Sequence, residues 1–144
     1  MNDVVGAIFS TGLTLIVGGL SVLAFIVAPM LFRSLPSREA AGSTFGRIFT
    51  AFGGVELTAA IAVCSCAVYW AYEAPGPRAT LRLWMAGALL LVSILHHLWV
   101  FPVGRRMAEQ PEARDRFKRV HRLSVSLAMA TLLLGLALVV QAAV

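Results

Sequence analysis

The sequence has 144 residues, of which 59% are hydrophobic and only 13% are charged, and its mean hydropathy is +0.84. So few polar residues cannot cover a water-soluble globule, and the composition is typical of a protein that lies in a lipid bilayer. The formal net charge of +5 would suggest a nucleic-acid partner in a soluble chain. Here the basic residues flank apolar segments, so we expect contacts with anionic lipid head groups and no nucleic acid.

Four apolar stretches are long enough to cross the hydrocarbon core of a bilayer, which takes about 20 helical residues. The first is not preceded by a basic residue, as a cleaved secretory signal would be, so we expect it to be retained. We predict one all-α domain over residues 1–144, an antiparallel bundle of four transmembrane helices. These helices are expected over residues 4–32, 45–72, 81–103 and 111–144.

The distribution of arginine and lysine predicts the orientation of the bundle, because basic residues concentrate in cytoplasmic loops. Ten of the twelve basic residues fall in or near the loops after the first and third helices, and Arg78 and Arg82 lie on the other side. We therefore predict a multi-pass protein of a bacterial inner (plasma) membrane, with both termini periplasmic or outside. The ten are Arg33, Arg38, Arg47, Arg105, Arg106, Arg114, Arg116, Lys118, Arg119 and Arg122.

Small residues predict where the helices approach one another, because helices in lipid associate through close packing. The first helix carries Ser10, Thr14 and Gly18 at a spacing of four, and Gly42 and Gly46 form a GxxxG pattern. We interpret both as inward faces of the bundle, with a contact between two copies of the chain as the alternative.

Glu56 is the only acidic residue well inside an apolar stretch. On a helix it shares a face with Gly53, Ala59 and Ala60, so this face is expected to pack against another helix. An ionisable residue within the membrane is a candidate for a proton or cation site. The alternative is a carboxyl group that is protonated, or bonded to a neighbouring hydroxyl, and that serves only helix packing.

Three histidines are candidate ligands near the cytoplasmic end. His96 and His97 lie near the end of the third predicted helix, and His121 lies near the start of the fourth. Facing imidazoles could bind a transition metal or the iron of a b-type haem, with His97 and His121 as candidate metal ligands. The alternative places all three in the interfacial zone, bonded to backbone or lipid head groups.

Arg33, Arg47 and Arg122 are expected at the same end of the bundle as the histidines. So many donors favour an anionic partner, either a lipid phosphate or the carboxylate of a bound ligand. The positive charge disfavours a metal cation, and Glu56 is expected to lie deeper than the histidines and not to offset it.

Three short runs, taken together, resemble the transmembrane-protein-205-like family, including its bacterial members classed as a domain of unknown function. They are LFRSLP at residues 31–36, WVFP at 99–102 and FKRVHRLS at 117–124. The resemblance implies a small four-helix membrane protein without an established reaction, in a family whose vertebrate branch is discussed in connection with resistance to metal-containing drugs. The positions that match the family pattern are Arg33, Pro36, Pro102, His121 and Ser124; His96 and His97 are not part of it.

Three classes of function remain open. The first is a carrier or channel-like protein for protons, metal species or small solutes. The second is a haem- or metal-binding membrane redox protein. The third is an accessory subunit of a larger membrane complex, and both the first and the third are compatible with a homo-oligomer. The sequence contains no phosphate-binding loop, dinucleotide fingerprint, zinc-protease motif or nucleophile elbow, so it does not indicate an enzyme.

Overall fold

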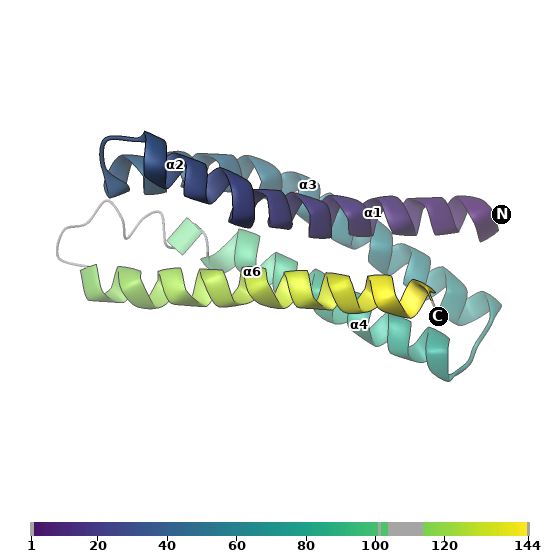
Figure 1. Cartoon of the computed structure of the whole chain (residues 1–144). Coiled ribbons are helices and arrows are strands. Elements are labelled where there is room, and N and C mark those ends of the chain that lie inside the picture. The colour runs from purple at the N-terminus through teal and green to yellow at the C-terminus, as the bar shows by residue number, and fades with distance from the viewer. Residues whose placement is uncertain (1, 101, 104–113, 144) are drawn as a thin grey trace.

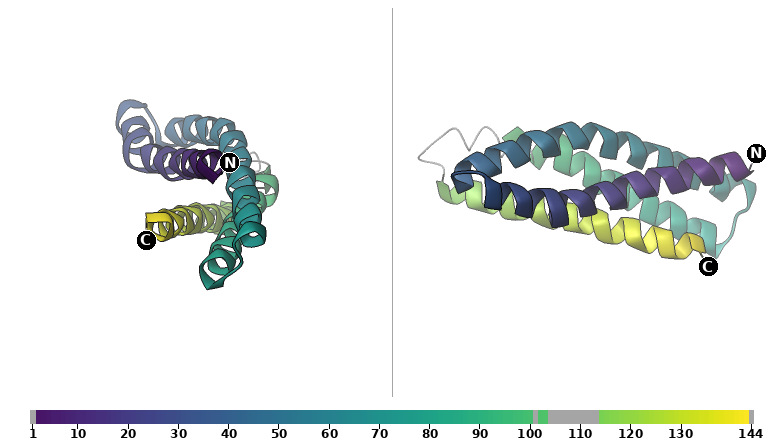
Figure 2. Two further views of the ribbon diagram at one scale, coloured as in Figure 1. Left: turned by 90° about the vertical axis from the view of Figure 1, so that its right-hand side faces the viewer. Right: turned by 45° about the horizontal axis from the view of Figure 1, so that its top comes forward.

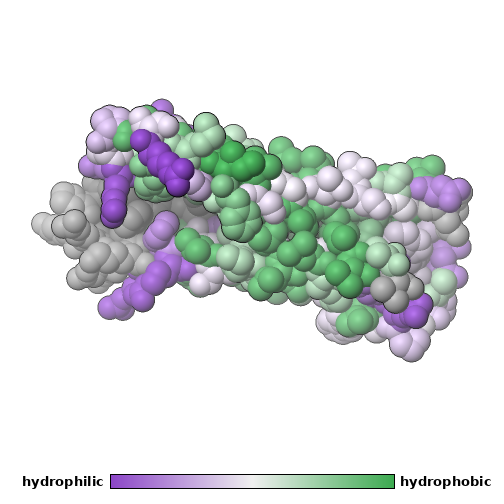
Figure 3. Space-filling model, viewed as in Figure 1, coloured by the Kyte–Doolittle hydropathy of each residue, from purple (hydrophilic) through white to green (hydrophobic). Residues whose placement is uncertain are grey.

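The computed structural model describes residues 2–100, 102–103 and 114–143, and these residues are helical apart from the short turns at 35–37 and 74–76, with no strand among them (Figure 1). Four helical segments, of 32, 36, 24 and 25 residues, are long and apolar enough to cross a membrane. The apolar side chains form a broad band along the middle of the molecule, and the hydrophilic ones gather at its two ends (Figure 3). The predicted architecture, an all-α bundle of four membrane-spanning helices, is confirmed.

The first rod extends from residue 2 to residue 34 and is continuous across a local widening. It comprises α1 (Asn2–Val22), the π-helical segment η1 (Leu23–Val27) and α2 (Ala28–Ser34). Pro29 explains the widening, because its ring cannot donate a backbone hydrogen bond and clashes with the preceding turn of an α-helix. The rod is slightly longer at both ends than the predicted range of 4–32.

The second rod, α3, covers Arg38–Glu73 and begins seven residues earlier than predicted. The side chain of Ser37 accepts a hydrogen bond of 3.1 Å from the backbone N–H of Ala40, which caps the helix and lets it start directly after a short turn. The loop after the first rod is therefore only a few residues long.

The third rod comprises α4 (Pro77–Ile94) and a second π-helical segment, η2 (Leu95–Val100). It starts at Pro77 and not at the predicted residue 81, because proline suits the first turn of a helix, where no N–H needs a partner. The fourth rod, α6, covers Arg114–Ala143. The predicted start of this helix at residue 111 lies outside the described residues.

The four rods form a ring in which α1 packs against α3 and α6, and α4 packs against the same two helices (Figure 2). Both termini lie at one end of the bundle, which we call the terminal end, and the turn between α2 and α3 lies at the other, the loop end (Figure 1). The core is mostly apolar, and its fully buried large side chains include Phe9, Ile16, Val63, Leu89 and Leu138.

The inward face of α1 is not the one predicted from small residues. Ser10, Thr14 and Gly18 are exposed on the outer surface of the bundle. The buried stripe of α1 instead consists of Phe9, Gly12, Leu13, Ile16 and Leu20. The interpretation of Ser10, Thr14 and Gly18, the Ser10 stripe, as an inward face is therefore wrong. Gly42 of the GxxxG pattern is exposed as well and does not lie on an inward face.

Candidate functional site

Glu56 lies midway along α3 and is fully buried in the bundle. Gly53, Ala59 and Ala60 are buried on the same face of the helix, as the sequence predicts. These small neighbours let α4 approach closely enough for its side chains to reach the carboxyl group. A carboxyl group at this depth has no access to bulk water and must find its partners within the protein.

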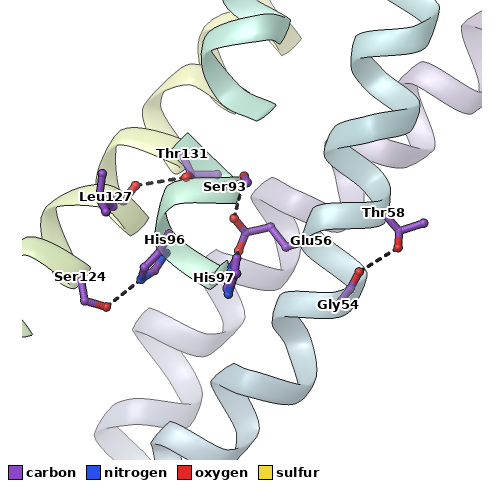
Figure 4. A network of polar contacts seen from close by, with 9 residues as sticks. All are labelled: Gly54, Glu56, Thr58, Ser93, His96, His97, Ser124, Leu127 and Thr131. Carbon is purple, nitrogen blue, oxygen red and sulfur yellow. Dashed lines mark hydrogen bonds and ion pairs between the residues drawn. The ribbon is translucent and has the colours of Figure 1, made fainter. Parts of the chain in front are cut away.

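Both oxygens of Glu56 have a partner on the third rod (Figure 4). The Ser93 hydroxyl donates a hydrogen bond of 3.0 Å to Oε1, and Nε2 of His97 lies 2.9 Å from Oε2. Ser93 and His97 are four residues apart, so they project from the same side of the rod. The side chain of His97 is only 7% exposed, so this contact is an interior pair and not a surface salt bridge.

The π-helical segment η2 carries both histidines into the interior. His96 is fully buried and its ring lies 4.8 Å from that of His97, centroid to centroid. Adjacent residues on a helix point roughly 100° apart, and here they reach two different neighbours. His97 meets α3, whereas Nε2 of His96 lies 2.7 Å from the Ser124 hydroxyl on α6. A π-turn of this kind is rare and often marks a functional site.

We use the name central polar network for Glu56, Ser93, His96, His97 and Ser124 (Figure 4). It links α3, the third rod and α6 through the middle of an otherwise apolar bundle. One atom of the network is not satisfied: Nδ1 of His96 is buried and has no hydrogen-bond partner among the described residues. A buried N–H without a partner is costly, so we infer that Nδ1 carries the lone pair and that Nε2 donates to Ser124.

Phe49 covers the network on the side of the loop end. Its ring centroid lies 5.2 Å from that of His96 and 5.6 Å from that of His97, and the second pair is stacked. Phe49 precedes Glu56 by two helical turns on α3, so it lies between the carboxyl group and the end of the bundle at which α3 begins.

Gly53 makes room for the imidazole of His97. A Cβ atom at this position would overlap the His97 ring. Gly54, the next residue, faces open space, and a side chain there would meet nothing within 4 Å. The absence of a side chain at position 53 is therefore a condition for the contact between His97 and Glu56.

The structure brings together only some of the residues that the sequence identifies as candidates. Glu56, His96 and His97 meet in the interior. Arg33, Arg47, His121 and Arg122, in contrast, are exposed on the surface. His96 and His97 therefore do not belong to the surface group that the sequence predicts, because they lie inside the bundle.

Two further expectations concern the charge around the histidines. We expected Glu56 to lie deeper than the histidines and apart from them. This expectation is wrong for His97, because the side chains of Glu56 and His97 are in direct contact. The two histidines considered as metal ligands lie in different environments. His97 is hydrogen-bonded inside the bundle, whereas His121 is exposed on α6. Within the described ranges, no group of three or more His, Cys, Asp and Glu side chains could hold a metal ion.

Sequence reasoning missed three residues of the site: Ser93, Phe49 and the role of Ser124. Serine is common in membrane helices, and phenylalanine is apolar, so neither is conspicuous in an apolar stretch. The spacing of four between Ser93 and His97 is the one signal that could have joined a hydroxyl to a histidine on the same helical face.

The fold and the site define a small multi-pass membrane protein with a buried polar network at its centre. Residues 11–113 match the family described as "Domain of unknown function (DUF4149)", which covers more than half of the chain, and the chain belongs to this family. No curated protein and no solved structure matches it.

Proposed function

We propose that this protein transfers protons within the membrane, with Glu56 and His97 as the pair of groups that exchanges the proton. The contact between the fully buried carboxyl group and an imidazole nitrogen, at 2.9 Å, carries this proposal. Carboxyl and histidine side chains within membrane helices recur in proton relays of pumps and transporters, because both can gain and lose a proton at modest cost.

The contact between Glu56 and His97 is compatible with two positions of one proton. Either a protonated Glu56 donates to a neutral His97, or the protonated imidazole donates to the carboxylate. Oε1 of Glu56 accepts from Ser93 in both cases, so the second oxygen is the one that takes part in exchange. The two forms differ only in the position of a proton along one hydrogen bond.

We infer that the pair exchanges its proton with the loop end of the bundle, and this exchange requires the Phe49 ring, which covers the network on that side, to move aside. His96 and Ser124 extend the network from His97 to α6. Toward the terminal end, the fully buried side chains next to the network are mostly apolar: Leu89 lies one turn beyond Ser93, and Val63 lies two turns beyond Glu56. Thr131 is the polar exception, and its hydroxyl donates to the backbone carbonyl of Leu127 and not to the network. Transfer across the whole membrane would therefore need a rearrangement of this apolar layer, or a second copy of the chain that completes the path.

We place the loop end in the cytoplasm of a bacterial cell, with the protein in the inner membrane and both termini outside. This orientation rests on the sequence, in which ten basic residues fall in or near the loops after the first and third helices, whereas Arg78 and Arg82 fall on the other side. The relationship to the transmembrane-protein-205-like family, carried by residues 31–36, 99–102 and 117–124, is likewise part of this proposal.

The test is proton flux in liposomes that contain the purified protein and a trapped pH-sensitive dye. An imposed pH gradient, with the membrane potential clamped by potassium and an ionophore, should collapse faster than in protein-free liposomes. Glu56→Gln should return the rate to that of protein-free liposomes, because an amide cannot exchange a proton. The matched control is Glu39→Gln, which makes the same chemical change at an exposed position in the first turn of α3.

Equal rates for the parent protein and for Glu56→Gln, with both correctly folded, would overturn the proposal. Loss of flux in Glu39→Gln as well would also contradict it, because the effect would then not depend on the buried pair.

A second candidate is a role in a larger membrane assembly, and the outward position of Ser10, Thr14 and Gly18 favours it. Such small-residue faces let helices from separate chains pack closely. The mass of the protein in nanodiscs tests this candidate: a dimer, a larger homo-oligomer or copurifying chains would support it, and a monomer would not.

The haem or metal alternative receives less support from the geometry. Nε2 of His96 and Nε2 of His97 are both bonded to other residues, so ligation through either atom would break a hydrogen bond in the interior.

A further inference from the structure

Arg82 lies at the opposite end of the bundle from the polar network's histidines, in the second turn of α4. Its guanidinium is held in place by residues from three other helices. Nε donates a hydrogen bond of 3.0 Å to Oε1 of Gln141 on α6. The guanidinium carbon lies 4.7 Å from the centre of the Trp70 ring on α3 and 5.8 Å from that of Phe9 on α1.

Gln141 is itself fixed, because its Nε2 donates a hydrogen bond of 3.0 Å to the backbone carbonyl of Arg78. The amide oxygen is thereby aimed at Nε of Arg82. The cation stays over the aromatic rings, an arrangement that stabilises an arginine near apolar surroundings. The position of the guanidinium is therefore set before any ligand arrives.

Most of the donors of this guanidinium have no acceptor among the residues that the structure describes. Arginine has five N–H groups, and only Nε–H is bonded to a described residue. Asp3 and Glu73 also lie at this end of the bundle, at the start of α1 and the end of α3. Among the described residues, however, no carboxylate lies within salt-bridge distance of Arg82. The two Nη groups remain, and they form the planar fork that matches the oxygens of a phosphate.

The depth of Arg82 fits the head-group region of a bilayer. It follows the first residue of α4 by five positions, roughly 8 Å along a helix. The exposed Arg78 lies on the same face of α4, one turn closer to the first residue of the helix. It adds a second positive charge. Arg78 and Arg82 are exceptions to the charge distribution of the sequence, in which the other ten basic residues fall in or near the segments that follow the first and third apolar stretches.

We propose that Arg82, preset by Gln141 and Trp70, binds a phosphate group at the terminal end of the bundle, with Arg78 as a second contact. The phosphate can belong to a lipid head group or can be free in solution, and both present the same oxygens to the guanidinium. This site is separate from the proposed proton-transfer pair, and neither proposal depends on the other.

Trp70 offers a local readout of this site, because the ring lies directly against the guanidinium. The other two tryptophans, Trp84 and Trp99, are exposed, so both can be changed to phenylalanine to leave Trp70 as the only tryptophan. The purified full chain with these two changes is titrated in neutral detergent with short-chain phosphatidylglycerol and, separately, with inorganic phosphate. We expect a saturable change in Trp70 fluorescence that Arg82→Gln weakens by about tenfold or more, since charge-assisted hydrogen bonds are lost. Arg33→Gln, an equal change of charge at the exposed loop end, should leave the titration unaltered.

The two titrants distinguish the sources of the phosphate: a response to phosphatidylglycerol alone assigns a lipid head group, and a response to inorganic phosphate assigns a free anion. No saturable response to either, or the same response in Arg82→Gln as in Arg33→Gln, overturns the proposal and leaves Arg82 as a link between helices only. If Arg82→Gln does not fold, Arg82→Lys takes its place, because lysine keeps the charge and lacks the fork. Undiminished binding in Arg82→Lys would equally contradict a site built on the guanidinium.

Discussion

Two substitutions of Glu56, by glutamine and by alanine, distinguish the contribution of its hydrogen bonds to stability from the contribution of its charge. Glutamine has nearly the same shape: its amide oxygen can accept from Ser93, and its NH₂ group can donate to a neutral His97. Both contacts, at 3.0 and 2.9 Å in the parent protein, can therefore persist. Alanine removes both and leaves the Ser93 hydroxyl and the His97 nitrogen buried without a partner.

The expected free energies follow from these contacts. We expect Glu56→Ala to lower the free energy of unfolding by about 2–5 kcal/mol, from two lost interhelical hydrogen bonds and two buried groups left unpaired. We expect Glu56→Gln to lower it by no more than about 1 kcal/mol. Both variants are compared with the parent by titration of the micelle with sodium dodecyl sulfate, followed by circular dichroism.

Equal losses of about 3 kcal/mol or more in the two variants would refute this reasoning, because they would show an ionised Glu56 whose charge is required by an imidazolium partner. Losses close to zero in both would refute it differently, by showing that the pair does not hold α3 to the third rod.

Three further outcomes are expected. Gly53→Ala should displace the His97 ring and lower stability by about 1–3 kcal/mol, measured by the same titration, whereas Gly54→Ala, into open space, should change it by less than about 0.5 kcal/mol. Gly12→Ala should push α1 away from α3, because its Cβ would lie 2.8 Å from a methyl group of Val63. We expect the free energy of unfolding to fall by about 1–3 kcal/mol, and a titration curve like that of the parent would contradict this. A reporter active only in the cytoplasm should be inactive when fused to the C-terminus, and its activity there would reverse the proposed topology.

The four helices could be predicted because the bilayer sets a minimum apolar length, and that length is visible in the sequence. The ends of the helices are harder to predict from the sequence, because they depend on individual residues at the helix starts. Ser37 starts α3 directly after the turn, and Pro77 starts α4 within a segment that looks like a loop. Serine is polar and proline is typical of turns, so a search for apolar stretches places both outside the helices.

The inward faces of the helices could be predicted only in part. In lipid the outer surface is as apolar as the interior, so polarity does not tell one face from the other. The Glu56 face was recognisable because an ionisable group must turn away from lipid. The Ser10 stripe has no such group, and the structure places it outside.

The partners of Glu56 could not be predicted from residue spacing, because they depend on a π-helical turn in the third rod. The π-turn at Leu95–Val100 carries His96 and His97 into the interior, where each reaches a different helix. A regular helical period would not predict that two adjacent residues both belong to the core. The sequence identified Glu56, His96 and His97 as candidates but did not predict the contact between Glu56 and His97.

The central claim is that Glu56 and His97 share one proton inside the membrane, and infrared difference spectroscopy of the protein in lipid tests it most directly. A change of pH should produce a carbonyl band from a protonated carboxyl group that is absent in Glu56→Gln and shifted in His97→Asn, because the hydrogen-bond partner of that group has changed. A band that survives in Glu56→Gln, or one that His97→Asn leaves in place, would contradict the shared proton.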